Sequence, residues 1–590
     1  MSNTSFKQLS KIENFVKETN IYFNKDILAI EQIPDAGVGI VATTDIPRDT
    51  IIVKIPKSSI FTSKTCTINN LLTEESIDGI MGIHLAVLYE LFVFMESKSH
   101  WYDYLSFIFE DCLIEDRKDG FYLPPGYWCS EEKALLKGTL LDCQYDGLKK
   151  HKDIITIYKQ FVTTAYKWKQ ECDLEIPKIL QNENYYHLTE EELDAEVTKE
   201  EEDLLNSDVR FLKFIEIGYI ISSRVFEIDC YHLFGLVCIV DLFNHNSKED
   251  IHFENDYDVC EICGKLECGH MVETYEDSEL DSNEEAEEEG EEGEEEEGEY
   301  AESEDESSDE SGNENEMSTH HDQNDVCEIR AIHDIQKGQQ IFNTYGKFPN
   351  AVLLLKYGFV VENNPYDKVS LVQEFNEVVD LISGVEKVDI EKRLKWWKEE
   401  GVFLLDEELD DEESEEEEED GEEDGEEDGE EESGKEGEEY DDYDKSLDEN
   451  IEEEEEEGEE ENESDIIEEE DDISDDVDIE TFWKDKIYID STGEASPFLE
   501  RLCVILAMNN EQFDVKKLQL QPDLLEDIKS TEIKQLLTLS LKMLKKILNK
   551  KKLFKIPENL PDLPNIKEIK KMLLIENDII LKCKENFNLQ

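Results

Sequence analysis

Short apolar runs and turn residues alternate over the first part of the chain. β-rich runs occupy residues 27–30, 40–42 and 51–55, and a turn segment with Pro, Asp and Gly occupies residues 34–39. This spacing predicts a small meandering sheet near the N-terminus. From Ile83 onward the apolar residues recur every three to four positions, which predicts one buried face of a helix.

Helical and β patterns alternate along the rest of the chain. Eight consecutive residues that are apolar or Gly, beginning at Leu233, indicate a strand buried on both faces. We therefore expect helices over residues 131–168 and 189–223, a buried strand over 233–242, β structure over 326–332 and 340–345, a helix over 350–357 that ends at Gly358, and a helix over 533–548.

Charge changes this picture in two places. The 590 residues include 153 acidic and 57 basic residues, and the formal net charge is -96. Residues 274–316 hold 24 Asp and Glu without a basic residue, and residues 406–480 hold 50 with two lysines. Because like charges repel and little apolar area offsets the entropy of ordering, we expect two solvated, disordered insertions. This acidity argues against direct nucleic-acid binding, which depends on Lys and Arg, and favours a basic protein as partner.

The cysteines and the apolar runs bear on location. Thirteen cysteines are scattered from Cys66 to Cys583, an odd number that suits a reducing compartment better than a disulfide framework. Residues 1–20 lack the apolar core of a signal peptide, and the longest apolar run, 233–240, is too short to span a bilayer. We expect a monomer without membrane association in the cytoplasm, with the nucleus as a second compartment.

Three stretches far apart in sequence could carry chemistry, although each alone has an ordinary structural explanation. Residues 37–42 (GVGIVA) contain a G-x-G, which allows close backbone approach to a ligand but also occurs in tight turns. Residues 241–245 (DLFNH) place Asn and His after the expected buried strand, where they bind a ligand or only satisfy local backbone groups. Residues 338–346 (GQQIFNTYG) place a tyrosine at a strand end, where its ring could equally belong to the core.

Together and in this order, the stretches resemble SET-domain lysine methyltransferases. The resemblance is to the group of Rubisco large-subunit methyltransferase and the yeast ribosomal-protein and elongation-factor lysine methyltransferases. Residues 350–359 (NAVLLLKYGF), 223–226 (SRVF) and 99–105 (SHWYDYL) match further segments of that group. The six matches cover residues 30–360.

The resemblance implies an α+β fold and a set of boundaries. A SET-domain β-fold with a pseudoknot would form from residues 1–98, which begin with a helix, and from residues 223–365. The pseudoknot would place the Asn-His strand beside the Tyr345 strand. A helical insert would occupy residues 99–222, a Cys-rich and acidic insertion residues 256–326, and an all-α, substrate-binding-like domain residues 366–590, which include the acidic insertion 406–480.

The resemblance also implies S-adenosylmethionine as cofactor and a role for individual residues. Tyr345 would be the catalytic tyrosine, and Tyr357 and Phe359 would line the channel for the substrate lysine. Many relatives carry an acidic residue where this chain has Ala36. The cofactor would contact the backbone of the segment Ala36, Gly37 and Val38. It would also contact the side chains of Ser223, Arg224, Asn244, His245 and Phe359.

A separate cluster of metal-binding residue types lies in residues 260–270 (CEICGKLECGH). The C-x2-C start has the usual spacing for zinc, and a third cysteine and a histidine follow within seven residues. A structural zinc site would use Cys260, Cys263, Cys268 and His270, with Cys327 or His252 as substitutes for one ligand. The alternative is a set of free thiols in a loop of a reduced protein.

We therefore predict an S-adenosylmethionine-dependent protein-lysine N-methyltransferase that acts on a ribosomal protein or a translation elongation factor. Two alternatives stay open. One is a non-catalytic acidic binder or chaperone of basic proteins on a degenerate SET scaffold. The other is a protein-histidine methyltransferase with the same fold.

Overall fold

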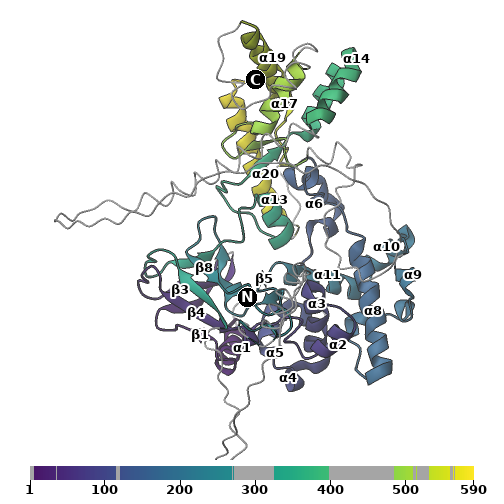
Figure 1. The fold of residues 1–590 in the computed structure, drawn as a ribbon, viewed down its shortest axis with the longest axis vertical. Helices are drawn as coiled ribbons and strands as arrows, with labels where there is room; N and C mark the ends of the chain where they lie inside the picture. Colours follow the sequence, from purple (N-terminus) through teal and green to yellow (C-terminus); the bar gives the residue numbers. More distant parts are fainter. Residues whose placement is uncertain are drawn as a thin grey trace, which may run out of the picture. The chain divides into compact units, whose positions relative to one another are not determined.

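The protein is described by a computed structural model. It describes residues 5–34, 36–114, 120–193, 195–266, 268, 270, 325–397, 484–508, 513, 531–557, 563 and 565–589. Both acidic blocks, 274–316 and 406–480, lie outside the described residues. The chain forms two compact units, of which the first comprises Met1–Lys368 and Phe554–Ile579 and the second Val369–Leu553 and Ile580–Gln590 (Figure 1).

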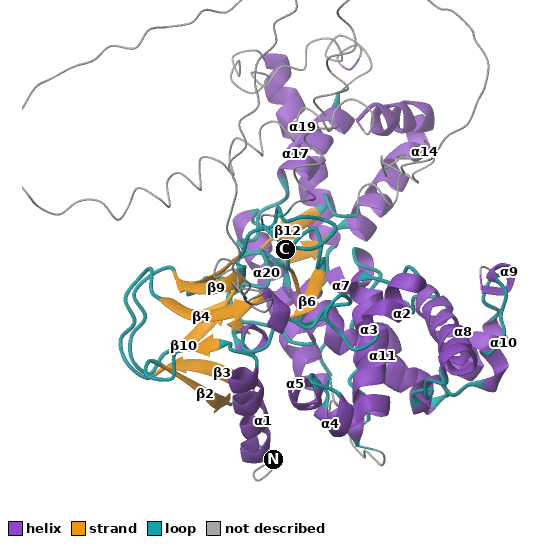
Figure 2. Ribbon diagram, turned by 60° about the horizontal axis from the view of Figure 1, so that its bottom comes forward, coloured by secondary structure: helices purple, strands orange, loops and turns teal. Residues whose placement is uncertain are grey.

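The first unit combines strands and helices, with its larger sheets to one side and α3, α8 and α11 to the other (Figure 2). Its strands are β1 (Tyr22–Phe23), β2 (Leu28–Ile33), β3 (Gly37–Ala42), β4 (Ile51–Pro56), β5 (Val225–Glu227), β6 (Phe234–Leu236), β7 (Asn244–His245), β8 (Ile251–Glu254), β9 (Val326–Ala331) and β10 (Gln340–Asn343). Its helices are α1 (Ser5–Glu18), α2 (Asn69–Glu74), α3 (Gly79–Tyr89), α4 (Met95–Lys98), α5 (Tyr102–Ile108), α6 (Ser130–Leu135), α7 (Leu140–Cys143), α8 (Asp153–Cys172), α9 (Glu190–Leu193), α10 (Lys199–Leu205), α11 (Val209–Ser222), α13 (Asn350–Val352) and the part of α20 (Ile566–Asn586) up to Ile579.

Two four-stranded sheets bring early and late parts of the chain together. Their strand orders are β1-β4-β9-β8 and β2-β3-β10-β7. β2 and β3 form an antiparallel hairpin, which confirms the predicted β pattern near the N-terminus. β10 pairs antiparallel with β3 and parallel with β7, so that Phe342 lies opposite Asn244 and Asn343 opposite His245. The late strand β10 thus lies between β3 and β7, which is the adjacency expected of the pseudoknot.

The core of the first unit is built from the apolar faces of these elements. Along β9 the buried residues Cys327, Ile329 and Ala331 alternate with less buried ones, as a strand with one core face requires. Residues 82–89 of α3 are all buried, so this helix is surrounded by the core on every side. The stretch Gly79–Lys98 is the one described helix long and apolar enough to cross a membrane, and burial inside the protein accounts for its composition.

Helices over residues 131–168 and 189–223 are confirmed, although turns divide them into α6 to α8 and α9 to α11. Aromatic side chains hold α8 against α11. The Tyr158 ring lies 5.2 Å from Phe211 and 5.1 Å from Phe214, and Phe161 lies 5.6 Å from Phe214. All three pairs are edge-on, and such pairs at these distances are favourable beyond the area they bury.

The long buried strand expected over residues 233–242 is wrong. Only β6 is extended, and the chain then turns at Ile239, whose φ is 78°, into a 3₁₀ turn at Val240–Leu242. Residues 236–240 are nevertheless fully buried. An unbroken apolar run predicts burial on all sides, and it does not distinguish a strand from an irregular core segment.

Among its described residues, the second unit contains β11 (Lys368–Ser370) from Val369 onward, α14 (Val372–Trp396), β12 (Tyr488–Asp490), α17 (Pro497–Ala507), α19 (Thr531–Lys550) and the rest of α20. α17 begins with an N-cap, because the Ser496 hydroxyl accepts from the backbone N–H of Leu499 at 3.3 Å. At its other end the buried Arg393 guanidinium donates to the carbonyls of Leu506 and Met508 at 3.1 and 2.6 Å. α19 confirms the helix predicted over 533–548.

Candidate active site

The parallel pairing of β7 and β10 sets the first contact of the site. Tyr345 follows β10 by two residues, and its backbone N–H donates to Nδ1 of His245 at 3.0 Å. Because Nδ1 accepts this bond, the imidazole carries its proton on Nε2 in the neutral form. Burial lowers the pKa of His245, against an opposing effect of Glu249, and so favours the same neutral form.

The Tyr345 hydroxyl is held by the segment that precedes β7. It donates to the carbonyl of Phe243 at 3.1 Å. Burial raises the pKa of Tyr345, while the positive charge of Arg224 opposes this shift and the negative charge of Asp241 adds to it. The phenol is therefore neutral at physiological pH, and its oxygen keeps the capacity to accept a hydrogen bond.

A widened helical turn supplies two further rings. After α13 the chain forms a π-helical turn, Leu353–Tyr357, which ends at Gly358 with a φ of 76°. The helix predicted over 350–357, with glycine just past its end, is therefore confirmed with a wider last turn than an α-helix has. The Tyr122 hydroxyl donates to the carbonyl of Tyr357 at 2.8 Å and packs against this glycine.

The rings of this turn surround Tyr345. Tyr357 lies 4.7 Å from Tyr345, and Phe359 lies 6.2 Å from Tyr345 and 6.1 Å from His245. Burial, with a smaller contribution from Tyr345, raises the pKa of Tyr357 to about 12. We call Tyr345, Tyr357, Phe359 and His245 the aromatic cluster. It forms a half-buried, largely apolar wall that carries one oriented hydroxyl.

Asn244 connects the G-x-G segment to the strand that carries this cluster. Its side-chain amide donates to the carbonyl of Val38 at 3.3 Å. A Cβ on Gly39 would lie 2.9 Å from that amide nitrogen and 2.7 Å from Ile33, so only glycine leaves room for the contact. Gly37 has a φ of 78° and no atom within 4 Å of the place of a Cβ, so a ligand can approach its backbone there.

A buried carboxyl lies behind Tyr345. The Asp241 side chain is 1% exposed and lies 3.6 Å from the Arg224 guanidinium, which also donates to the Asp241 carbonyl at 3.0 Å. The Tyr104 hydroxyl donates to the same carboxylate at 3.3 Å. Burial raises the pKa of Asp241 to about 6, although Arg224 and Tyr104 both lower it. Oδ1 has no hydrogen-bond partner among the described residues.

The raised pKa of Asp241 predicts a pH-dependent contribution to stability. The folded state binds this proton more tightly than the unfolded state, whose Asp pKa is about 3.9. The contribution is therefore complete below about pH 4 and is lost as the pH rises through about 6. We expect Asp241→Asn to reduce the drop in unfolding free energy between about pH 4 and pH 7 by about 2–3 kcal/mol, since one pKa unit is about 1.4 kcal/mol. Urea unfolding at both pH values measures this drop in unfolding free energy. Asp26→Asn, at an exposed position, is the control. A drop in Asp241→Asn equal to that of wild type would contradict the prediction.

Comparisons with known proteins match most of the residues of this site to one family. Residues 37–346 match the SET domain family, which is more than half of the chain. Ribosomal lysine N-methyltransferase 3 of Saccharomyces cerevisiae (strain ATCC 204508 / S288c) is 34% identical over 410 residues, which cover 68% of this chain and 70% of the yeast protein. The chain belongs to the SET domain family.

More distant SET proteins were also found. Protein SET DOMAIN GROUP 40 of Arabidopsis thaliana is 22% identical over 356 residues, which cover 59% of this chain and 55% of that protein. A crystal structure of the SET domain of LSMT bound to lysine and AdoHcy is 16% identical, with a TM-score of 0.33, and the match covers 62% of this chain and 60% of that one. A structure of Rubisco LSMT bound to AdoMet is 15% identical, with a TM-score of 0.31, and the match covers 63% of each chain.

The SET domain brings some of the predicted cofactor residues together and leaves others apart. Val38 and Asn244 are in contact, and Arg224 lies close enough to influence the Tyr345 phenol. Ala36 lies exposed in the turn between β2 and β3. The Ser223 hydroxyl donates to the Ile220 carbonyl at 2.9 Å, a contact within the end of α11. Their predicted contacts with the cofactor stay predictions.

Three residues of this site were not predicted from the sequence. Asp241 and Tyr104 each lay within a quoted motif, at the start of DLFNH and inside SHWYDYL. The available signal was an Asp directly after the apolar run 233–240. Tyr122 lies in a stretch without a motif. It contacts Tyr357 across 235 residues of sequence, a pairing that local spacing does not encode.

The four predicted metal-binding residues do come together. The ligand atoms of Cys260, Cys263, Cys268 and His270 all lie within 4.8 Å of one another. The two suggested substitutes are not part of this group. Cys327 is buried in β9, opposite Ile55 of β4, and His252 is exposed in β8 beside Glu249.

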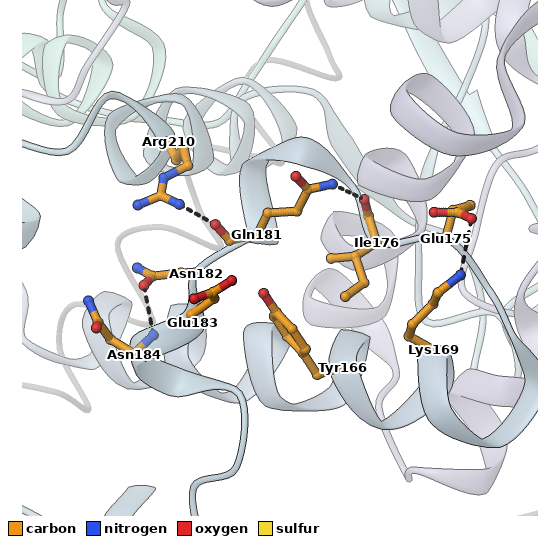
Figure 3. Close-up of a pocket in the computed structure, with 9 residues that line it drawn as sticks. All are labelled: Tyr166, Lys169, Glu175, Ile176, Gln181, Asn182, Glu183, Asn184 and Arg210. Atoms are coloured by element: carbon orange, nitrogen blue, oxygen red, sulfur yellow. Dashed lines mark hydrogen bonds and ion pairs between the residues drawn. The ribbon is translucent and has the colours of Figure 1, made fainter.

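A shallow hollow of about 530 Å³ lies elsewhere, in the helical insert (Figure 3). It shares no residue with the aromatic cluster. Two of its charged groups are paired: Lys169 lies 3.0 Å from Glu175, and Arg210 lies 2.6 Å from Asp208 and donates to the carbonyl of Gln181.

Proposed function

We propose that this SET domain is an S-adenosylmethionine-dependent protein-lysine N-methyltransferase whose substrate is a ribosomal protein. The observation that carries the proposal is the fixation of Tyr345, whose backbone is held by His245 and whose hydroxyl is held by the carbonyl of Phe243. The name of the yeast relative, a ribosomal lysine N-methyltransferase, supports the substrate class.

The residues beside the aromatic cluster fit S-adenosylmethionine. The open backbone at Gly37, the Asn244 amide and the partly exposed Arg224 guanidinium suit its amino-acid portion, and Phe359 offers a ring face. The Gln340 amide nitrogen is a buried donor without a hydrogen-bond partner among the described residues, and it lies beside Gly39. When bound, the cofactor supplies a methyl group on a positively charged sulfonium. The residues that would hold it are Ala36, Gly37, Val38, Ser223, Arg224, Asn244, His245 and Phe359.

The aromatic cluster prepares the substrate amine. A lysine amine has a reference pKa of about 10.4 and must be neutral to attack a methyl carbon. Burial against Tyr345 and Tyr357 removes water from the amine and favours its neutral form, by the same desolvation that raises the pKa values of these phenols. The oriented oxygen of Tyr345 and the surrounding rings then fix the amine in line with the methyl group.

The two acidic blocks suit a basic substrate, because opposite charges attract over long range. We predict that removal of residues 406–480 leaves cofactor affinity unchanged and weakens substrate binding severalfold at low salt, with little effect at high salt where the attraction is screened. Binding of a purified basic ribosomal protein by wild type and deletion variant, measured at two salt concentrations, tests this. Equal affinities at low salt would remove this role for the block.

The cofactor separates this proposal from the acidic binder on a degenerate scaffold. Calorimetry with S-adenosylmethionine should show binding to wild type and weaker binding to Asn244→Ala, because Asn244 orients the Val38 carbonyl. No heat of binding to wild type would favour the binder. An elongation factor as substrate, or histidine as the methylated residue, would appear in product analysis.

We also propose a monomer that acts in the cytoplasm, with the nucleus as a second compartment. The thirteen cysteines all lie in the described part of the chain and none is in a disulfide, which suits a reducing location. Light scattering of the purified protein and fractionation of cells would test the two statements separately.

A further inference from the structure

A second reactive group of side chains lies after β8, on residues that the aromatic cluster does not use. Nδ1 of His270 lies 3.7 Å from the sulfur of Cys260 and 3.7 Å from the sulfur of Cys268. With Cys263 the four ligand atoms lie within 4.8 Å of one another. Around a tetrahedral zinc ion, bond lengths of about 2.0–2.3 Å separate neighbouring ligand atoms by about 3.5–3.8 Å. The two sulfur–nitrogen distances are therefore those of a zinc site, and the other ligand atoms lie near enough to close around one ion.

The backbone holds this geometry through its own hydrogen bonds. The N–H groups of Cys263 and Gly264 donate to the carbonyl of Cys260 at 3.3 and 2.7 Å, and the N–H of Cys260 donates to Lys265 at 3.0 Å. Gly264 has a φ of 70°, and a Cβ there would lie 2.4 Å from the Tyr231 ring. The tight turn presents the first two sulfurs on one side, and Tyr231 packs against its glycine.

The chain around the turn is anchored to the core by a buried lysine. The Lys57 side chain is 2% exposed, and its ammonium lies 2.8 Å from the carboxylate of Asp229 and 3.4 Å from that of Asp325. It also donates to the carbonyl of Asp256 at 2.8 Å. Asp256 precedes the cysteines, and Asp325 is the first described residue after His270. One ammonium thus holds the chain on both sides of the inserted segment.

We propose that the three thiols and the imidazole bind one zinc ion and so close the base of the insertion, through Cys260, Cys263, Cys268 and His270. On binding, each thiol releases its proton to solvent and forms a sulfur–zinc bond, and His270 gives the lone pair of Nδ1 while its proton stays on Nε2. Sulfur-rich ligands select zinc over magnesium or calcium, which prefer oxygen. Four protein ligands leave no open coordination position, so the zinc is structural.

The site should contain metal in the full-length protein purified under reducing conditions. We expect about one zinc per chain by elemental analysis, as one closed tetrahedral site requires. Replacement by Co²⁺ should give the intense visible absorption of a tetrahedral, thiolate-bound ion. Addition of a chelator should make three more thiols reactive and speed up amide exchange at Cys260 and Gly264, whose hydrogen bonds form the turn.

Single substitutions separate a four-ligand site from an incidental one. Cys263→Ser and His270→Ala should lower zinc affinity more than tenfold, whereas the matched control Cys172→Ser, an exposed cysteine at the end of α8, should bind zinc as wild type does. Less than a tenth of a zinc per chain, no cobalt spectrum, or a disulfide among the three cysteines would overturn the proposal. Full zinc binding by His270→Ala would exclude the histidine as a ligand and overturn the four-ligand site. None of these readouts depends on methyl transfer.

Discussion

Tyr345→Phe should lower methyl transfer by about a hundredfold or more while cofactor affinity stays within about twofold, because an oriented polar group at the reacting centre acts mainly in the transition state. The substitution removes one oxygen, which donates to the Phe243 carbonyl, and leaves the ring that packs 4.7 Å from Tyr357. The backbone contact with His245 does not involve this oxygen. Single-turnover rates with labelled S-adenosylmethionine, together with calorimetry, separate the two effects.

A matched tyrosine shows whether the effect belongs to this position. Tyr22 in β1 is 47% exposed, so Tyr22→Phe should retain wild-type activity. Equal activity of Tyr345→Phe and wild type would show that the hydroxyl is not needed for the reaction. Equal loss of cofactor binding and rate in Tyr345→Phe would assign the residue to binding alone.

Gly358→Ala should lower kcat/KM by about ten- to a hundredfold, because a displacement of about 1 Å at a reacting centre can cost that much. The residue has a φ of 76°, which costs a non-glycine residue about 1–2 kcal/mol. A Cβ there would also lie 2.0 Å from the Tyr122 hydroxyl. Relief of this clash would move the turn that carries Tyr357 and Phe359.

The clash can be separated from the backbone strain. Tyr122→Phe removes the nearest atom that the new Cβ would meet and leaves the ring carbon Cζ at 2.8 Å, so the double variant Gly358→Ala with Tyr122→Phe should recover part of the lost activity. Gly338 also has a positive φ, of 85°, but no atom lies within 4 Å of the place of a Cβ. Gly338→Ala is therefore the control: it should introduce backbone strain without loss of activity. If the double variant is no more active than Gly358→Ala alone, the clash with the Tyr122 hydroxyl is not the cause of the lost activity.

Local sequence patterns predicted the turns and the helix end of the site, which depend on neighbouring residues. A turn between two β-rich runs predicted the β2 and β3 hairpin, and a glycine after an apolar helical run predicted the end of the turn at Gly358. The adjacency of the Asn-His strand and the Tyr345 strand was different. It followed from the family resemblance, because β7 and β10 are about a hundred residues apart and no spacing rule pairs them.

Long-range contacts of single side chains could not be predicted. Tyr104 reaches Asp241 across 137 residues, and this contact and the neighbouring guanidinium set the environment of Tyr345. The apolar run that begins at Leu233 led to the wrong prediction of a long strand, because burial on all sides is common to strands and to irregular core segments. In both cases the missing information is three-dimensional packing, which a single sequence does not carry.

The central claim is tested most directly by labelling. Wild type and Tyr345→Phe are incubated with radiolabelled S-adenosylmethionine and a ribosome-containing lysate from cells that lack this protein, and any labelled band is identified by mass spectrometry. The account predicts methyllysine in a basic ribosomal protein with wild type and at most trace labelling with Tyr345→Phe. No labelled protein with wild type, or a label on histidine, would contradict it.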